Sequence, residues 1–226
     1  MTVSGPVMQA PAMSVAERPA SPALPRRRGR LGTGATVLTG LAALLPAFMF
    51  VLPLWTIRLV APQYPEGLGM HIRINTIEGL TPTDLGNING LNHYIGMRVI
   101  LPDAIPELAL MPWILAGIIG LGVLTMLLRR RAVLLAWIGV YASAAIAGMA
   151  DFWKWGYDYG HNLDAATAII KVPGMSYQPP LLGSKQLLNF TATSWPASGG
   201  VLAGLSLALA VAAVVLAFRK SGAEPV

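Results

Sequence analysis

The chain has 226 residues, of which 54% are apolar, 12% are charged and none is cysteine. Soluble domains carry about 25% charged residues, so this composition excludes an ordinary soluble globule, and the missing cysteine excludes disulfide scaffolds and thiolate metal sites. The net charge of +6 favours either nucleic acid or a membrane as the partner, and only the positions of the basic residues decide between them.

Four uncharged segments of bilayer length follow a polar N-terminal tail. Residues 1–32 are rich in Pro, Ala, Ser and Arg and lack apolar periodicity, so they are expected to form a disordered basic tail. Each later segment has about the 20 apolar residues that a helix needs to cross a bilayer. The segments are 33–55, 109–128, 132–150 and 197–218. The sequence therefore predicts an all-α membrane protein with four transmembrane helices.

The first segment is interpreted as an uncleaved anchor. A cleaved signal peptide is the alternative, but the segment is longer than a signal core, and Pro53-Leu54-Trp55 lacks the small residues of a cleavage site. Pro46 predicts a kink in this helix, which neighbouring transmembrane helices can accommodate.

The basic residues lie on one side of the predicted arrangement. The two tails and the turn 129–131 hold ten basic and two acidic residues, a net charge of +8. The two long connections, 56–108 and 151–196, hold six basic and eight acidic residues, a net charge of −2. Because cytoplasmic segments near span ends are enriched in Lys and Arg, both termini are predicted to be cytoplasmic and both loops extracytoplasmic. This indicates a multi-pass membrane protein, with the lipid bilayer as partner and no nucleic acid.

The two outer loops are predicted to be ordered, with some irregular or short β structure. Residues 70–75 alternate in polarity, which is typical of a half-buried strand, and turn residues follow up to Gly90. The aromatic run 151–161 fits an interfacial belt and a continuation of the third helix above the membrane. Residues 187–196 are expected to form an irregular segment over the membrane surface.

The candidate metal ligands are imidazole and thioether groups of these loops. Both groups suit Cu(I) where no thiolate is present. His93 and Met97 are four residues apart, so a helical turn would place them on one face. Met70 and His71 are adjacent, so a strand would point them to opposite sides. The predicted site combines His71, His93 and Met97 with either Met175 or His161. The alternative is that these residues have ordinary packing and hydrogen-bonding roles.

A second metal candidate contains a carboxylate. On a continued helix, Asp158 and His161 are three residues apart and face the same way, with Asp151 two turns earlier. Alternatively, the carboxylate orients the histidine.

No catalytic residues are predicted, because the chain has no Walker A loop, G-x-S-x-G, H-E-x-x-H or C-x-x-C motif. The four segments contain no Asp, Glu, Lys, Arg or His, which argues against a pump, a proton-coupled transporter or an intramembrane haem.

Three loop motifs carry a resemblance to a known family. They are APQYPEGL at 61–68, NINGLNHYIGM at 87–97 and YQPP at 177–180. With the four-span layout, they resemble small bacterial membrane proteins that often accompany nitrous oxide reductase genes, some of which are similar to NosL-type copper-chaperone accessory proteins. The resemblance covers about residues 45–218. It implies a periplasmic accessory role in copper delivery to, or assembly of, a copper respiratory enzyme. Lipoprotein copper chaperones of that pathway use a cysteine for lipid attachment, and here four spans would replace that anchor.

Three functions follow as hypotheses. The first is a membrane-anchored accessory protein that handles copper together with a periplasmic or membrane-bound copper enzyme or copper carrier. The second is a non-enzymatic docking subunit of a membrane complex, with aromatic anchors in the second outer loop. These anchors are Trp153, Trp155, Tyr157 and Tyr159. The third is a copper monooxygenase-like membrane subunit that uses Asp158 and His161.

Overall fold

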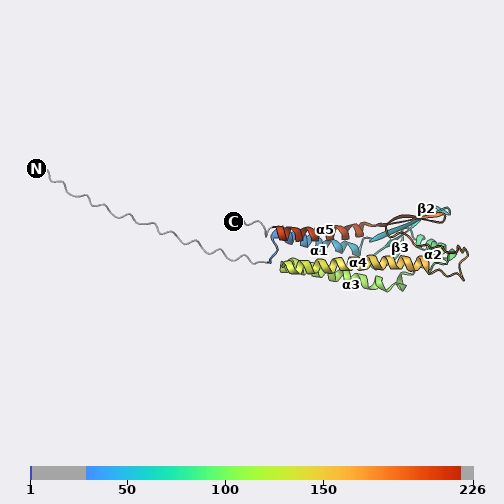
Figure 1. The fold of residues 1–226 in the computed structure, drawn as a ribbon, viewed down its shortest axis with the longest axis horizontal. Coiled ribbons are helices and arrows are strands. Elements are labelled where there is room, and N and C mark those ends of the chain that lie inside the picture. Colours follow the sequence, from blue (N-terminus) through green and yellow to red (C-terminus); the bar gives the residue numbers. More distant parts are fainter. Residues whose placement is uncertain (2–28, 220–226) are drawn as a thin grey trace.

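Four long apolar helices and a small antiparallel sheet make up the protein. The computed structural model describes residue 1 and residues 29–219, and within this part four helices are long and apolar enough to cross a membrane. They are the helix Thr33–Phe50, which includes α1 (Thr33–Leu44), then α3 (Pro106–Leu128), α4 (Arg131–His161) and α5 (Ser198–Arg219). The helices run side by side, and the sheet lies at one end of them (Figure 1). The four predicted apolar helices are therefore confirmed. The predicted disordered tail falls almost entirely outside the described residues.

The helix formed by the first apolar segment is shorter than predicted. Helix α1 ends at Leu44, and a 3-10 segment continues it from Leu45 to Phe50. Pro46 lies in this segment, where its missing N–H removes an α-helical hydrogen bond and favours the tighter geometry. The chain then enters strand β1 at Trp55, so the predicted boundary of the helix at residue 55 is wrong.

Helix α4 is the longest element and connects the two parts of the molecule. Its 31 residues correspond to about 46 Å at 1.5 Å per residue, whereas the hydrocarbon core of a bilayer is about 30 Å thick. The helix therefore continues beyond the apolar segment that ends at Ala150, as its aromatic run indicated. This extension, residues 151–161, supports the sheet.

The sheet has five antiparallel strands in the order β3-β2-β1-β5-β4 and is built from both loops. The strands are β1 (Trp55–Ala61), β2 (Tyr64–Ile72), β3 (Ile77–Gly79), β4 (Gly183–Leu187) and β5 (Phe190–Pro196). In the centre, Thr56 pairs with Trp195 and Val60 with Thr191. The prediction of an irregular segment at 187–196 is therefore wrong, and the all-α description holds only for the apolar helices. Threonine and aromatic residues favour this strand, and small buried residues occupy its inner face.

Two separate apolar cores hold the protein together. The first lies between the long helices and includes small residues of α1 and α5 with Leu134 and Trp137 of α4. The second lies between the sheet and helix α2 (Asp84–Tyr94), and its buried residues come from several elements. They are Ile57, Leu68, Met70, Ile77, Ile88, Ile100 and Leu108. Phe152, Trp155 and Tyr159 of the α4 extension pack against this second core, so α4 links the sheet to the helices.

The described arginines of the predicted cytoplasmic segments gather at one end of the helices. The turn between α3 and α4 pairs with the chain just before α1, through Leu31 N–H to the Arg129 carbonyl at 2.6 Å and Arg131 N–H to the Gly29 carbonyl at 2.9 Å. The Arg131 guanidinium lies 5.3 Å from the centre of the Phe218 ring, next to Arg219 at the end of α5. Five arginines therefore share this end. They are Arg30, Arg129, Arg130, Arg131 and Arg219.

Candidate functional site

Three segments of the predicted loops meet at the end of α4. The Asp164 N–H donates to the Gly96 carbonyl at 2.8 Å, and Ile169 and Ile170 N–H both donate to the Tyr94 carbonyl, at 3.0 and 2.8 Å. Tyr177 N–H donates to the Gly160 carbonyl at 2.9 Å. These bonds bring together the end of α4, the turn after α2 and the chain of 162–177. Of the predicted ligands, His161, His93, Met97 and Met175 lie in this region, which we call the α4-tip region.

His161 is exposed on the last turn of α4 and is held in one orientation. Its Nδ1 lies 3.0 Å from the Tyr157 carbonyl oxygen, and its ring stacks on the Tyr157 ring with 4.0 Å between centroids. A carbonyl oxygen only accepts, so Nδ1 carries the hydrogen. In the neutral ring, Nε2 therefore keeps a free lone pair. Histidines that bind metals commonly donate their other ring N–H to a carbonyl in this way.

Met97 does not share a helix face with His93, contrary to the geometry considered for this pair. Helix α2 ends at Tyr94, and Gly96 adopts the left-handed region with φ 76°. A Cβ on Gly96 would lie 2.7 Å from the Asp164 carbonyl oxygen, so only glycine allows this close approach. His93 is exposed at the end of the helix, whereas Met97 is half-buried just beyond it. The turn is thus fixed against the chain that follows α4.

Met175 and Asp158 approach the α4-tip region from different elements. Met175 is half-buried two residues before Tyr177, which is bonded to Gly160 beside His161. Asp158 lies on α4, one turn before His161 on the same side as predicted, but its carboxylate pairs with the Lys154 ammonium at 3.3 Å. This exposed ion pair engages one oxygen of the carboxylate that the second metal candidate needs.

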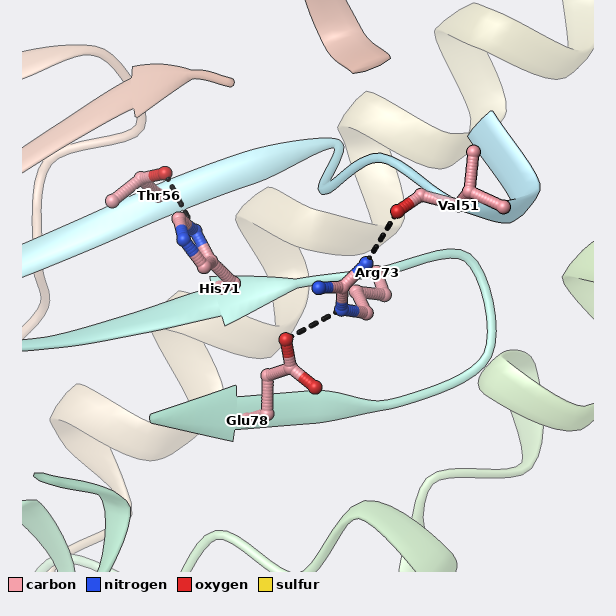
Figure 2. Close-up of polar contacts among 5 residues, drawn as sticks. All are labelled: Val51, Thr56, His71, Arg73 and Glu78. Carbon is pink, nitrogen blue, oxygen red and sulfur yellow. Dashed lines mark hydrogen bonds and ion pairs between the residues drawn. The ribbon is translucent and has the colours of Figure 1, made fainter. Parts of the chain in front are cut away.

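His71 lies apart from the other candidates, on strand β2. Its Nδ1 is 3.0 Å from the Thr56 hydroxyl on the adjacent strand β1 (Figure 2). Its neighbour Met70 is buried in the core with Ile88 of α2, and adjacent strand residues point to opposite faces. His71 therefore faces away from α2, as the alternation predicted, and is not brought together with His93.

Figure 2 also shows how the end of the first helix is tied to the sheet. Arg73 donates from Nη1 to the Val51 carbonyl at 2.7 Å and from Nε to the Glu78 carboxylate at 2.6 Å. A guanidinium can hold two acceptors at once in fixed directions, so the connection is rigid. This connection was not predicted, because Arg73, Glu78 and Val51 come from separate turns and strands.

The aromatic residues of the α4 extension divide between two faces. Trp153 and Tyr157 stack on each other at 5.5 Å and are 51% and 41% exposed. Trp155 and Tyr159 form a second pair at 4.4 Å and pack against the core of the sheet. Only the first pair is therefore available as an anchor for a partner. This division follows from helical spacing, because residues 153 and 157 are four apart, as are residues 155 and 159, and residues four apart share a helix face.

Asp84 fixes the loop between β3 and α2, a role that the sequence did not indicate. One carboxylate oxygen accepts the Gly69 N–H at 2.9 Å, and the other accepts the Thr81 hydroxyl. The bond from Thr81, together with that from Gly69, lowers the pKa of Asp84 against the opposing effect of burial. The side chain thus joins β2 to the start of α2 across the second core.

The donor set of the α4-tip region limits its possible metal chemistry. Within residues 29–219, no three His, Asp or Glu side chains come close enough to hold one metal ion. A hard-metal cage of carboxylates is therefore not formed there, and imidazole with thioether groups is the set that the region offers. Comparison with protein-family models and with curated proteins gives no match to this chain.

Proposed function

We propose that the protein is a membrane-anchored accessory protein that handles copper or assists assembly of an extracytoplasmic copper enzyme of the nitrous oxide reductase type. Copper(I) is its cargo, bound transiently in the α4-tip region by His161 with Met97 and Met175, and with His93 at the edge. The observation that carries this proposal is the hydrogen bond from His161 Nδ1 to the Tyr157 carbonyl, which leaves Nε2 free. The motif resemblance of the loops supports the copper context.

The same proposal includes an orientation in the bacterial inner membrane. The five arginines gathered at one end of the helices support a cytoplasmic position for that end and for both termini. The sheet, α2 and the α4-tip region are then periplasmic, where they reach a periplasmic or membrane-bound copper enzyme or copper carrier. The helices anchor the protein and position this periplasmic part.

A Cu(I) titration of the full-length protein in detergent, against a competing chelator, tests the copper site. We expect the double variant His161→Ala with Met97→Ala to bind Cu(I) at least tenfold more weakly than the parent. His71→Ala is the matched control, because His71 lies on the opposite face of the sheet. It should change the affinity less than twofold.

Equal weakening by the control and by the double variant would contradict the proposed ligand set. Absence of Cu(I) binding beyond weak surface association in the parent would contradict the copper function altogether. Met175→Leu keeps the apolar volume and removes the thioether, so a weaker Cu(I) affinity in this variant indicates that Met175 is a ligand rather than a packing residue.

A docking subunit is the second candidate function, favoured by the exposed pair Trp153 and Tyr157. Stacked, half-exposed aromatic residues are frequent anchors at interfaces. We expect Trp153→Ala to reduce co-purification of a partner after crosslinking in membranes at least fivefold. Trp113→Ala is the matched control, since Trp113 is 76% exposed on α3 within its apolar segment. A partner that is retained by Trp153→Ala would contradict this function.

No structural observation favours the monooxygenase-like alternative, since the Asp158 carboxylate contacts the Lys154 ammonium.

A further inference from the structure

A cavity of about 160 Å³ lies where α3 begins and where α4 leaves its apolar segment. Among its lining residues are Glu107 of α3 and Asp151 of α4. These are the first charged residues beyond the apolar segments 109–128 and 132–150. The cavity therefore lies at the level where lipid headgroups meet water.

The charges around the cavity are only partly paired. Lys154 and Asp158 form an ion pair at 3.3 Å and compensate each other. Among the described residues, Glu107, Asp151 and Arg98 form no ion pair within 4.0 Å. The Arg98 guanidinium instead lies over the Tyr159 ring, 5.0 Å from its centre. The cavity thus offers two carboxylates and one guanidinium to a ligand.

An indole beside the cavity has an unsatisfied donor. Trp155 lines the cavity, and its Nε1 is buried without a hydrogen-bond acceptor in the described part of the chain. A buried donor without a partner is unfavourable in the folded protein. Trp and Tyr rings are also the side chains that proteins place at membrane interfaces.

The arrangement suits an organic cation better than a metal ion. No three carboxylates or histidines among the described residues converge to hold one ion, so the acids do not form a metal cage. A primary ammonium donates three hydrogen bonds and is satisfied by two carboxylates and water. A quaternary ammonium has no N–H to donate, so paired carboxylates distinguish the two.

We propose that this cavity binds the phosphoethanolamine headgroup of a membrane phospholipid, with its ammonium at Glu107 and Asp151 and its phosphate at Arg98. The acyl chains lie along the apolar surfaces of α3 and α4 below the cavity. A bound lipid fixes the α4 extension, and with it the sheet, relative to the membrane. This proposal does not depend on copper binding.

Native mass spectrometry of the full-length protein, titrated with single phospholipids, tests the proposal. We expect phosphatidylethanolamine to bind at least tenfold more tightly than phosphatidylcholine with the same acyl chains. The double variant Glu107→Gln with Asp151→Asn should bind the two lipids equally, because it removes the acceptors for the ammonium. Arg98→Gln should weaken both lipids by a similar factor and preserve their ratio. Asp103→Asn is the control, since Asp103 is exposed and outside the lining.

The ratio of the two affinities separates recognition from misfolding, because a misfolded variant would lose both lipids together. Equal affinity of the parent for both lipids, or an unchanged ratio in the double variant, would overturn the proposal. Free O-phosphoethanolamine is the second probe. Weak competition by it, at least a hundredfold less effective than the lipid, supports the membrane as the source of the headgroup. Competition at equal concentration would overturn that assignment.

Discussion

Replacing Gly160 by alanine is expected to displace the chain that covers the end of α4 and to disorder the α4-tip region. A Cβ at this position would lie 2.7 Å from the Gln178 Cβ and still closer to the Gln178 main chain. Main-chain atoms cannot rotate away, so the covering chain has to move, and the bond between Tyr177 N–H and the Gly160 carbonyl is lost. Overpacking of this kind costs about 1–3 kcal/mol.

Gly156→Ala is the matched control for this variant. Gly156 lies one turn earlier on the same face of α4, and a Cβ there would meet the Pro179 ring at an ordinary 4.0 Å. Because alanine is favoured over glycine within a helix by about 0.5–1 kcal/mol, this control should stabilise the protein slightly. The two alanine variants are therefore expected to have effects of opposite sign.

Hydrogen exchange of residues 162–182 measures the displacement directly. We expect faster exchange of the Tyr177 amide in Gly160→Ala and no change in Gly156→Ala. Cu(I) affinity should fall only in Gly160→Ala if Met175 is a ligand. A Gly160→Ala protein as protected as the parent would show that the covering chain is not held by this contact.

The apolar helices were predictable because their signal is local. Each is an uncharged run bounded by charged residues, and a bilayer needs little more than such a run. The end of the first helix was not predicted, because Pro46 changes the helix type without changing the hydropathy of the segment. The extension of α4 was indicated by its aromatic run, which kept a helical spacing beyond Ala150.

The sheet was only partly predictable because its central pairing is non-local. The strand predicted at 70–75 overlaps β2 only at residues 70–72, because β2 runs from Tyr64 to Ile72. Strand β5 buries only Ala192 and Ser194 on its inner face, so its alternation is hidden from a hydrophobicity pattern. Its partner β1 lies more than a hundred residues earlier, and no local spacing reports such a pairing.

The candidate site shows the same limit. Residue types restricted the possible chemistry to imidazole, thioether and carboxylate groups, but only the fold separates the ligands. The left-handed turn at Gly96 ends α2 before Met97, and the strand alternation turns His71 away from His93. The ion pair of Asp158 with Lys154 fits a helical spacing of four residues, so it could have been predicted.

Replacing Asp84 by alanine is expected to destabilise the sheet and to remove part of its sensitivity to acid. Asp84 is only 6% exposed, and its carboxylate accepts bonds from the Gly69 main chain and the Thr81 hydroxyl. Hydrogen bonds to a charged group contribute about 1.5–3 kcal/mol, and alanine would also leave the Gly69 N–H buried without an acceptor. Asp84→Asn keeps the shape of the side chain and one acceptor oxygen, so it should reduce the stability of the protein less than Asp84→Ala does.

The pH dependence follows from the lowered pKa of Asp84, whose main cause is the bond from Thr81. A carboxyl group with a lower pKa in the folded state stabilises the protein above its unfolded value, near 3.8, and loses this contribution as the pH falls through the folded value. Unfolding of the full-length protein in detergent, followed by tryptophan fluorescence from pH 7 to pH 2.5, measures it. We expect the parent to lose stability below about pH 4 more steeply than Asp84→Asn. Glu66→Gln, an exposed change on the same strand β2 as Gly69, should retain the steep loss. If the stability of the parent and that of Asp84→Asn fell equally steeply with pH, other carboxylates would be responsible for the acid sensitivity of the sheet.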